Sequence, residues 1–205
     1  MALTKYNEKR NFKETSEPSG KIKVSESDLI FVVQRHKASH LHYDFRLELD
    51  GVLKSWAVPK GPSLNSKDKR LAMMVEDHPY DYKDFTGEIP EGNYGAGIVE
   101  IWDKGTYSDL ENSDRKTAEK NLRAGLKAGN LKVTMFGKKL KGEFALVKLK
   151  PKEGKDDNSW LLIKHHDKYA VDTAYDSEVE TPKNSPINKW LKENKEGSKK
   201  KSPSK

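Results

Sequence analysis

Alternating hydrophobic and polar residues occur along most of the chain in short runs separated by turn residues. The runs have the length and the β-branched and aromatic content of strands, which favours a β-barrel or sandwich. Only the segment 114–129 has helical spacing, and Gly125 and Gly129 weaken or end that helix. We expect a mainly β fold: a small antiparallel β-barrel, closed or partly open, with one short helix. The expected strands are residues 28–34, 41–49, 52–58, 70–76, 97–107, 130–137, 142–149 and 159–165.

The run 40–49 has two unlike faces. Successive strand residues point to opposite sides, so His42, Asp44 and Arg46 share one face. The other face is apolar and is explained as core, whereas the polar face requires a functional reason. The polar face holds His40, His42, Asp44, Arg46 and Glu48, and the apolar face holds Leu41, Tyr43, Phe45, Leu47 and Leu49.

The dipeptide Asp50-Gly51 between two strand patterns predicts a two-residue hairpin, because a type I′ turn needs positive φ at both central positions. The resulting register places Arg46 opposite Ser55 and Asp44 opposite Ala57. Small residues beside charged ones leave an open pocket floor. On the apolar side the same register pairs Leu49 with Val52, Phe45 with Trp56 and Tyr43 with Val58.

His42 and Asp44 have a spacing suited to metal binding. Two residues apart in a strand, their Cα atoms are about 6.6 Å apart, so imidazole and carboxylate can converge on one ion. His36, a short turn upstream, is the third candidate ligand. This set suits Mn²⁺ or another borderline divalent ion better than structural zinc, which prefers four nitrogen or sulfur ligands. The alternative is that the histidines are simply exposed or hydrogen-bonded.

Other motifs are less specific. The segment VEDHPYDYKDF places His78 between acidic and aromatic residues. The loop EIPEGNYGAG has glycines that permit close backbone approach to a phosphate, but no P-loop helix follows it, so we interpret it as a tight turn. His165 and His166 lack an acidic partner at suitable spacing and are interpreted as surface residues.

The composition narrows the class of protein. Of 205 residues, 34% are hydrophobic and 35% are charged, and the net charge of +7 favours a polyanionic partner such as nucleic acid. The absence of cysteine excludes disulfides and thiolate chemistry. No run approaches the roughly 18 apolar residues of a membrane span, and the N-terminus lacks the apolar core of a signal peptide. We therefore expect a cytoplasmic protein with no membrane partner.

Three regions are expected along the chain. Residues 1–27 form a polar N-terminal arm that cannot fold alone, and residues 28–175 form the β-barrel domain. Residues 176–205 form a basic, low-complexity tail that cannot bury enough surface to order itself, so both termini are expected to be disordered. Within the tail, residues 187–194 have the pattern of one marginal helical turn. The tail is either a solvated extension or a transient phosphate-binding segment.

Four motifs together resemble the 3′-phosphoesterase module of bacterial DNA ligase D and its free-standing archaeal and bacterial relatives, over about Arg10 to Tyr169. In that family, a small β-barrel with a Mn²⁺-dependent site removes a 3′-terminal ribonucleoside by phosphodiester cleavage. It then hydrolyses the remaining 3′-phosphate to leave a 3′-OH. The motifs are RHKASHLHYDFRLELDGVLKSWAVPKGPS, RLAMMVEDHPYDY, GEIPEGNYGAG and SWLLIKHHD.

The resemblance implies roles for individual residues. It makes His36, His42 and Asp44 the metal ligands, in agreement with the polar face. Asn11 departs from the family, which commonly has Asp after the arginine of its arm, and this changes the charge that the arm contributes. The implied catalytic residues are Arg46, His78, Tyr82 and Glu76; the implied substrate-binding residues are Arg10, Glu17, Lys60 and Arg70; His40 receives only a supporting role.

The implied chemistry is metal-assisted phosphoester hydrolysis. A divalent cation and Arg46 would share the charge that accumulates as phosphorus becomes five-coordinate. His78 would either donate a hydrogen bond to the phosphate or protonate the leaving oxygen. A contact to the 2′-OH is expected in the ribonucleoside step.

Three hypotheses compete. The first is a metal-dependent DNA 3′-end-processing phosphoesterase that acts on primer-templates or broken duplexes in non-homologous end joining. Its expected partners are separate ligase, polymerase and Ku-like proteins, the last by analogy only. The second is a non-catalytic DNA-end-binding or scaffolding module. The third keeps the chemistry but acts on RNA ends or small phosphate esters.

Overall fold

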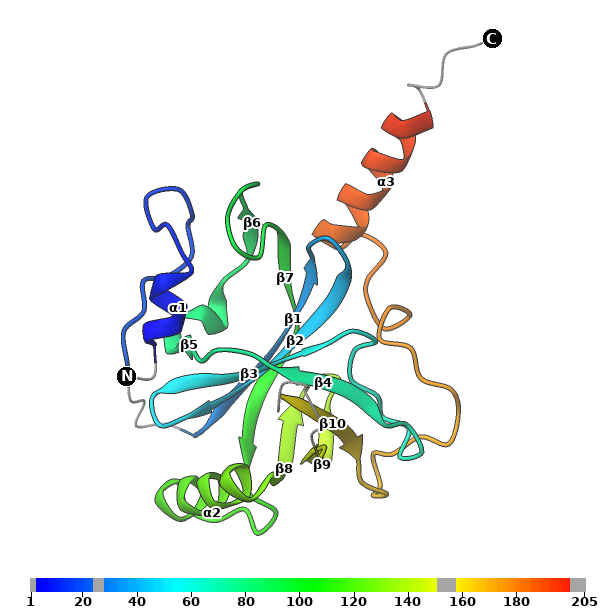
Figure 1. Cartoon of the computed structure of the whole chain (residues 1–205). Coiled ribbons are helices and arrows are strands. Elements are labelled where there is room, and N and C mark those ends of the chain that lie inside the picture. Colours follow the sequence, from blue (N-terminus) through cyan, green and yellow to red (C-terminus); the bar gives the residue numbers. More distant parts are fainter. Residues whose placement is uncertain (1–2, 24–27, 151–157, 200–205) are drawn as a thin grey trace.

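The computed structural model describes residues 3–23, 28–150 and 158–199. Within them, ten strands form one antiparallel sheet in the order β1-β2-β3-β4-β10-β9-β8-β7-β6, with β5 paired to β3. A further β1–β7 pairing closes eight of these strands into a barrel (Figure 1). The prediction of a small antiparallel β-barrel is therefore confirmed. The strands are β1 (Ile30–Lys37), β2 (Leu41–Leu49), β3 (Val52–Val58), β4 (Arg70–Met74), β5 (His78–Pro79), β6 (Gly87–Ile89), β7 (Gly97–Ser108), β8 (Asn130–Gly137), β9 (Lys141–Lys148) and β10 (Ser159–Lys164).

The described residues form more helices than the single short helix that was expected. They are α1 (Thr4–Glu8), the 3₁₀ helix η1 (Tyr80–Asp84), α2 (Arg115–Ala128) and α3 (Pro186–Lys199). The predicted helix is α2, which begins after Asp114, whose side chain accepts hydrogen bonds from two backbone N–H groups. It ends at Gly129, which has φ of +71°. Among the described residues, no helix combines the length and the apolar character that a membrane crossing requires.

The β2–β3 hairpin has the predicted register. Asp50 and Gly51 both have positive φ, +57° and +74°, as a type I′ turn requires. Arg46 pairs with Ser55 and Asp44 pairs with Ala57. The apolar pairs are also as predicted, with Leu49 opposite Val52, Phe45 opposite Trp56 and Tyr43 opposite Val58.

Two hydrophobic clusters lie on opposite faces of β1. The larger cluster fills the barrel and includes Phe31, Val33 and Phe45, together with apolar residues of α2. The smaller one lies on the outer face of the barrel and joins Val32 to Tyr6 of α1. Because strand residues alternate between faces, the polar face of β2 lies on the outer side of the barrel. Tyr82 and Ile89 of the second cluster line the same cavity as that polar face. The members of the second cluster are Leu3, Tyr6, Val32, Val52, Leu53, Tyr82, Phe85, Ile89 and Val99.

The segment after residue 176 differs from the solvated tail that was expected. Ser177 and Ile187 are fully buried, and the indole N–H of Trp102 donates to the Ser177 carbonyl at 3.2 Å. The single helical turn expected around residues 187–194 is part of the longer helix α3, which projects away from the barrel (Figure 1). Composition did not predict that this segment is ordered, because its order depends on contacts with barrel residues that are distant in the sequence. The last residues of the expected tail, 200–205, lie outside the described residues.

Candidate metal and phosphate site

Two neighbouring strands present the candidate metal ligands on one face. β1 and β2 are antiparallel, and His36 lies directly opposite His42, while Gln34 lies opposite Asp44. Residues 34 and 36 therefore share a face with residues 42 and 44. His36 is part of strand β1 itself, because pairing with both β2 and β7 continues that strand to Lys37.

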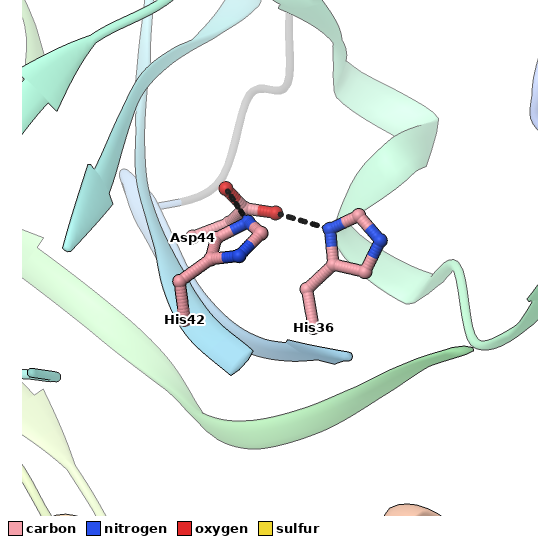
Figure 2. A group of neighbouring side chains, drawn as sticks. All are labelled: His36, His42 and Asp44. Carbon is pink, nitrogen blue, oxygen red and sulfur yellow. Dashed lines mark ion pairs between the residues drawn. The ribbon is translucent and has the colours of Figure 1, made fainter. Parts of the chain in front are cut away.

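The two imidazoles are oriented by backbone carbonyls. His36 donates from Nε2 to the Gly95 carbonyl at 2.9 Å, and His42 donates from Nδ1 to the His40 carbonyl at 3.0 Å. Because a carbonyl oxygen can only accept, each ring keeps its other nitrogen unprotonated when neutral. Those nitrogens face Asp44: Nδ1 of His36 is 3.5 Å from one carboxylate oxygen, and Nε2 of His42 is 3.7 Å from the other. Figure 2 shows each oxygen directed to a different ring.

This donor set fits a divalent cation. The ligand atoms of His36, His42 and Asp44 lie within 4.8 Å of one another. Nitrogen and oxygen ligands about 2.1 Å from a shared ion are themselves roughly 3–4 Å apart. Hydrogen bonding of the second ring nitrogen is the usual way in which proteins fix a metal-binding histidine. Burial would raise the pKa of Asp44, but the Arg46 guanidinium holds it well below its ordinary value, so the carboxylate stays charged.

Arg46 is held beside the carboxylate by three hydrogen bonds. It donates from Nε to Gln34 Oε1 at 2.7 Å, from Nη1 to Ser55 Oγ at 2.9 Å and from Nη2 to Asp44 Oδ2 at 3.1 Å. A guanidinium has five N–H groups, so one on each terminal nitrogen remains for an anion. Gln34 is fixed in turn, because its amide donates to the carbonyls of Tyr82 and Phe85 at 3.0 and 2.9 Å.

His78 is buried and oriented through both ring nitrogens. Nδ1 donates to the Glu76 carbonyl at 2.9 Å, so Nε2 accepts from Arg10 Nη2 at 3.1 Å. Burial lowers the pKa of His78 well below its ordinary value, and the charges of Arg46 and Arg10 lower it further. His78 is therefore neutral near pH 7 in the metal-free protein.

The N-terminal arm closes one side of the site. Arg10 also donates to Glu17 at 2.9 Å and to Glu76 at 3.2 Å, and its guanidinium carbon lies 3.8 Å from the Tyr6 ring centroid. The Tyr82 hydroxyl donates to Glu17 at 2.9 Å. Burial, followed by the charge of Glu17, raises the pKa of Tyr82 well above its ordinary value, although Arg46 opposes this. The arm thus adds the Arg10 cation and the Glu17 carboxylate to the barrel face, where Arg10 also pairs with Glu76 of the barrel domain.

These groups surround one cavity of about 200 Å³. The expected metal ligands and all four expected catalytic residues line it, as does Arg10. Glu17 supports the cavity from behind through Arg10 and Tyr82. The cavity is lined by Arg10, His36, Ala38, His42, Asp44, Arg46, Ala57, Val75, Glu76, His78, Tyr82, Ile89, Tyr94 and Gly95.

Other expected residues lie elsewhere. Lys60 and Arg70 both line two hollows that are separate from the candidate cavity. Arg70 donates a hydrogen bond to Asp68 at 2.8 Å. Asn11 is exposed, and its Oδ1 accepts from the backbone N–H of Lys13 at 3.3 Å. The exposed His40 contributes its carbonyl to the orientation of His42.

The histidine pair at the end of β10 lies outside the metal site. His165 has a partner that sequence reasoning did not find, because its Nδ1 lies 3.1 Å from Glu143. Glu143 is on the paired strand β9, 22 positions away, so local spacing could not reveal the contact. His166 is exposed, as expected for a surface residue.

Sequence reasoning also missed the roles of four residues in or around the cavity. Gln34 fixes Arg46, Gly95 orients His36, and Lys9 and Tyr94 form part of the rim. The signal for Gln34 was its spacing of two residues from His36 on the same strand. Lys9 and Tyr94 are in contact although they are 85 positions apart in the sequence, so local spacing does not reveal the contact.

Comparison with known proteins identifies the family. The sequence profile of the DNA Ligase D 3′-phosphoesterase domain matches residues 34–148. The chain is 48% identical over 167 residues to the multifunctional non-homologous end joining protein LigD of Pseudomonas aeruginosa, and 40% identical over 166 residues to that of Mycolicibacterium smegmatis. These matches cover 80% of this chain and 19% and 21% of the relatives, so the chain spans about a fifth of their length. The chain belongs to the DNA ligase D 3′-phosphoesterase domain family.

Proposed function

We propose that the protein is a Mn²⁺-dependent phosphoesterase that processes DNA 3′ ends for non-homologous end joining. It removes a 3′-terminal ribonucleoside and then the 3′-phosphate, leaving a 3′-OH. The observation that carries the proposal is the convergence of two oriented imidazole nitrogens and the Asp44 carboxylate beside the Arg46 guanidinium in one cavity. The family of the chain and the end-joining relatives support it.

His36, His42 and Asp44 would hold the cation, which when bound supplies Lewis-acid stabilisation of the phosphate oxygens. The two remaining N–H groups of Arg46 bind a nonbridging oxygen and orient the phosphate. Arg10 keeps Nε2 of His78 unprotonated before substrate arrives, and the negative charge of a bound phosphate group would favour its protonation. His78 then donates a hydrogen bond or a proton to the phosphate group.

The tightly bonded residues around the phosphate serve to position it. Glu76 and Glu17 fix Arg10, and Tyr82 closes the cavity beneath the Arg46 guanidinium, 4.8 Å from its ring centroid. Lys60 and Arg70, which lie outside the cavity, contact the nucleic acid at a distance from the scissile phosphate. The proposed setting is the cytoplasm, with separate ligase, polymerase and Ku-like proteins as partners.

The test uses a labelled primer-template with one 3′-terminal ribonucleotide, incubated with protein in Mn²⁺ or in EDTA. We expect shortening to a 3′-phosphate product and then to a 3′-OH product, in Mn²⁺ only. His42→Ala abolishes both products and lowers Mn²⁺ affinity, measured by calorimetry, by at least about tenfold. The matched variant His40→Ala keeps affinity and turnover, because His40 contributes only its backbone carbonyl.

Two outcomes would contradict the proposal. Primer binding without turnover in any divalent metal would indicate a non-catalytic end-binding module. Faster turnover of an all-RNA primer than of the DNA primer would assign the same chemistry to RNA ends.

A further inference from the structure

The exposed aromatic ring of Tyr94 lies at the rim of the candidate site. Two tyrosines line the cavity, of which Tyr82 is 2% exposed and Tyr94 is 51% exposed. A single exposed aromatic residue is ordinary on a protein surface. Tyr94 differs because its ring borders the same cavity as the candidate metal ligands, so a molecule held there would meet it.

The rim holds this ring in place from two sides. Lys9 donates to the Tyr94 hydroxyl at 3.4 Å, and the Lys9 Nζ atom lies 4.5 Å from the ring centroid. Gly92 and Gly95 flank the residue with φ of +88° and +79°, a conformation that favours glycine. The Gly95 carbonyl accepts the hydrogen bond from His36, so the loop with the ring is tied to a metal ligand. The loop thus presents an exposed aromatic surface next to the candidate metal site.

The size of the cavity determines what reaches this ring. Its volume of about 200 Å³ is below the roughly 300–1,000 Å³ of pockets that enclose small ligands. The charged groups at its base accommodate a phosphate and a cation. A nucleoside esterified to that phosphate therefore lies across the rim, where the π-face of its base can stack on an aromatic side chain.

The charges on this side of the rim favour the end of a strand. Lys9 is paired with Glu76 at 3.0 Å, and Arg10 is paired with Glu17 and Glu76 at 2.9 and 3.2 Å. These cations are already neutralised, so this side offers little attraction for further backbone phosphates. A terminal nucleoside has no phosphate beyond it and suits such a surface.

We propose that Tyr94 is the stacking platform for the base of the 3′-terminal ribonucleoside, and that it determines affinity for the ribonucleoside that leaves. The inference rests on the proposed function and extends it to the recognition of the leaving group. Lys9 orients the ring, and the loop glycines set its height above the phosphate. Because stacking reads the π-face, the platform accepts any of the four bases.

The test compares primers that end in a normal ribonucleotide with primers that end in an abasic ribose. Tyr94→Ala raises the KM for ribonucleoside removal about tenfold, within the range that alanine substitution gives for base–aromatic stacking, and changes kcat little. Wild-type protein shows the same raised KM on the abasic primer, where Tyr94→Ala adds no further loss. Tyr94→Phe retains the wild-type KM. The matched control is Tyr169→Ala, since Tyr169 is 40% exposed and has a lysine 5.1 Å from its ring centroid.

Two results would overturn the inference. One is an unchanged KM of Tyr94→Ala on the normal primer, and the other is an equal loss on normal and abasic primers, which would indicate a structural role. If wild-type protein cleaves neither primer, the proposed function fails. The role of Tyr94 is then tested by measuring primer binding without cleavage. A primer ending in 2-aminopurine riboside is then quenched by wild type and Tyr94→Phe but not by Tyr94→Ala, and absence of quenching by wild type rejects the platform.

Discussion

Arg10 of the N-terminal arm donates a hydrogen bond from Nη2 to Nε2 of His78 at 3.1 Å, across 68 positions of sequence. The contact joins the N-terminal arm, which is not part of the barrel, to an imidazole that lines the candidate cavity. It also fixes the direction of the hydrogen bond, because a guanidinium has no acceptor and the imidazole must accept. The arm is therefore part of the candidate site and fixes Nε2 as the acceptor nitrogen of His78.

Arg10→Ala is expected to lower kcat/KM for both steps at least about 100-fold, or about 2.7 kcal/mol of transition-state stabilisation. The substitution leaves the Glu17 and Glu76 carboxylates without their cation and frees His78 Nε2. Arg10→Lys does not restore activity, because one ammonium cannot replace the fork that reaches three side chains, Glu17, Glu76 and His78.

Steady-state kinetics on 3′-ribonucleotide and 3′-phosphate primers measure the effect. The control is Arg123→Ala, which removes an exposed guanidinium paired with Asp50 at the hairpin turn. Full activity of Arg10→Ala would show that the arm is dispensable.

The protonation of His78 gives a pH prediction for the metal-free protein. Its pKa is well below the ordinary 6.5, chiefly because it is buried. Between the folded pKa and 6.5 the unfolded state binds more protons, so this group makes stability rise with pH across that window and contributes fully above 6.5. ¹⁵N NMR should show a neutral imidazole with a protonated Nδ1 at pH 6, and the same residue should titrate near 6.5 in urea. A cationic His78 in the folded protein at pH 6 would contradict this assignment.

Much of the barrel and the centre of the site follow from local patterns. Alternation over residues 41–49, with Asp50-Gly51 after it, is sufficient to fix the β2–β3 register, since a shift of one residue would turn the apolar side outward. The same alternation places His42, Asp44 and Arg46 on one face. These predictions succeed because the determining residues lie within one hairpin.

The parts that sequence could not supply depend on contacts between distant segments. The arm reaches the cavity because Tyr6 is buried in the outer cluster. The local pattern of residues 1–27 does not indicate that position, and only the family resemblance placed Arg10 and Glu17 at the site. The order after residue 176 depends on Glu178, which accepts hydrogen bonds from the buried Arg35, 143 positions away in the sequence. Residue roles of this kind emerge only once the barrel has brought the segments together.

Gln34 is expected to position Arg46. Gln34→Ala removes the acceptor of Arg46 Nε and the side-chain amide that donates to the carbonyls of Tyr82 and Phe85. We expect kcat to fall about tenfold and the free energy of unfolding to fall by about 2 kcal/mol, as for buried polar groups that lose their partners.

The variant Gln34→Glu separates the two effects of Gln34. It keeps an acceptor for Arg46 but places a carboxylate against two carbonyl oxygens, so it should recover kcat more than stability. Urea unfolding and single-turnover kinetics give the two values. If kcat and the free energy of unfolding recover to the same extent, the loss of activity follows the loss of stability, and Gln34 has no separate role in positioning Arg46.

Glu178 is expected to stabilise the fold in a pH-dependent manner. Its carboxylate accepts two hydrogen bonds from the fully buried Arg35, at 2.9 and 2.6 Å, and one from the Tyr43 hydroxyl. Partial burial opposes ionisation, but these hydrogen bonds lower the pKa of Glu178 below its ordinary 4.5. The folded state therefore holds this proton less tightly than the unfolded state. The stabilisation is fully present above pH 4.5 and is lost as the pH falls through the folded pKa.

Glu178→Gln should lower the free energy of unfolding at pH 7 by about 1–2 kcal/mol. This is less than the roughly 3–5 kcal/mol for breaking a buried ion pair, because the Glu178 side chain is 40% exposed and Arg35 keeps Glu100 at 2.9 Å. The difference from wild type should shrink as the pH falls below 4.5, where the wild-type carboxylate becomes protonated. The control Glu180→Gln, at an exposed position of the same segment, should change stability by less than about 0.5 kcal/mol. Urea unfolding from pH 3 to pH 7 provides the comparison, and a difference that does not vary with pH would mean that the charge on Glu178 does not anchor this segment.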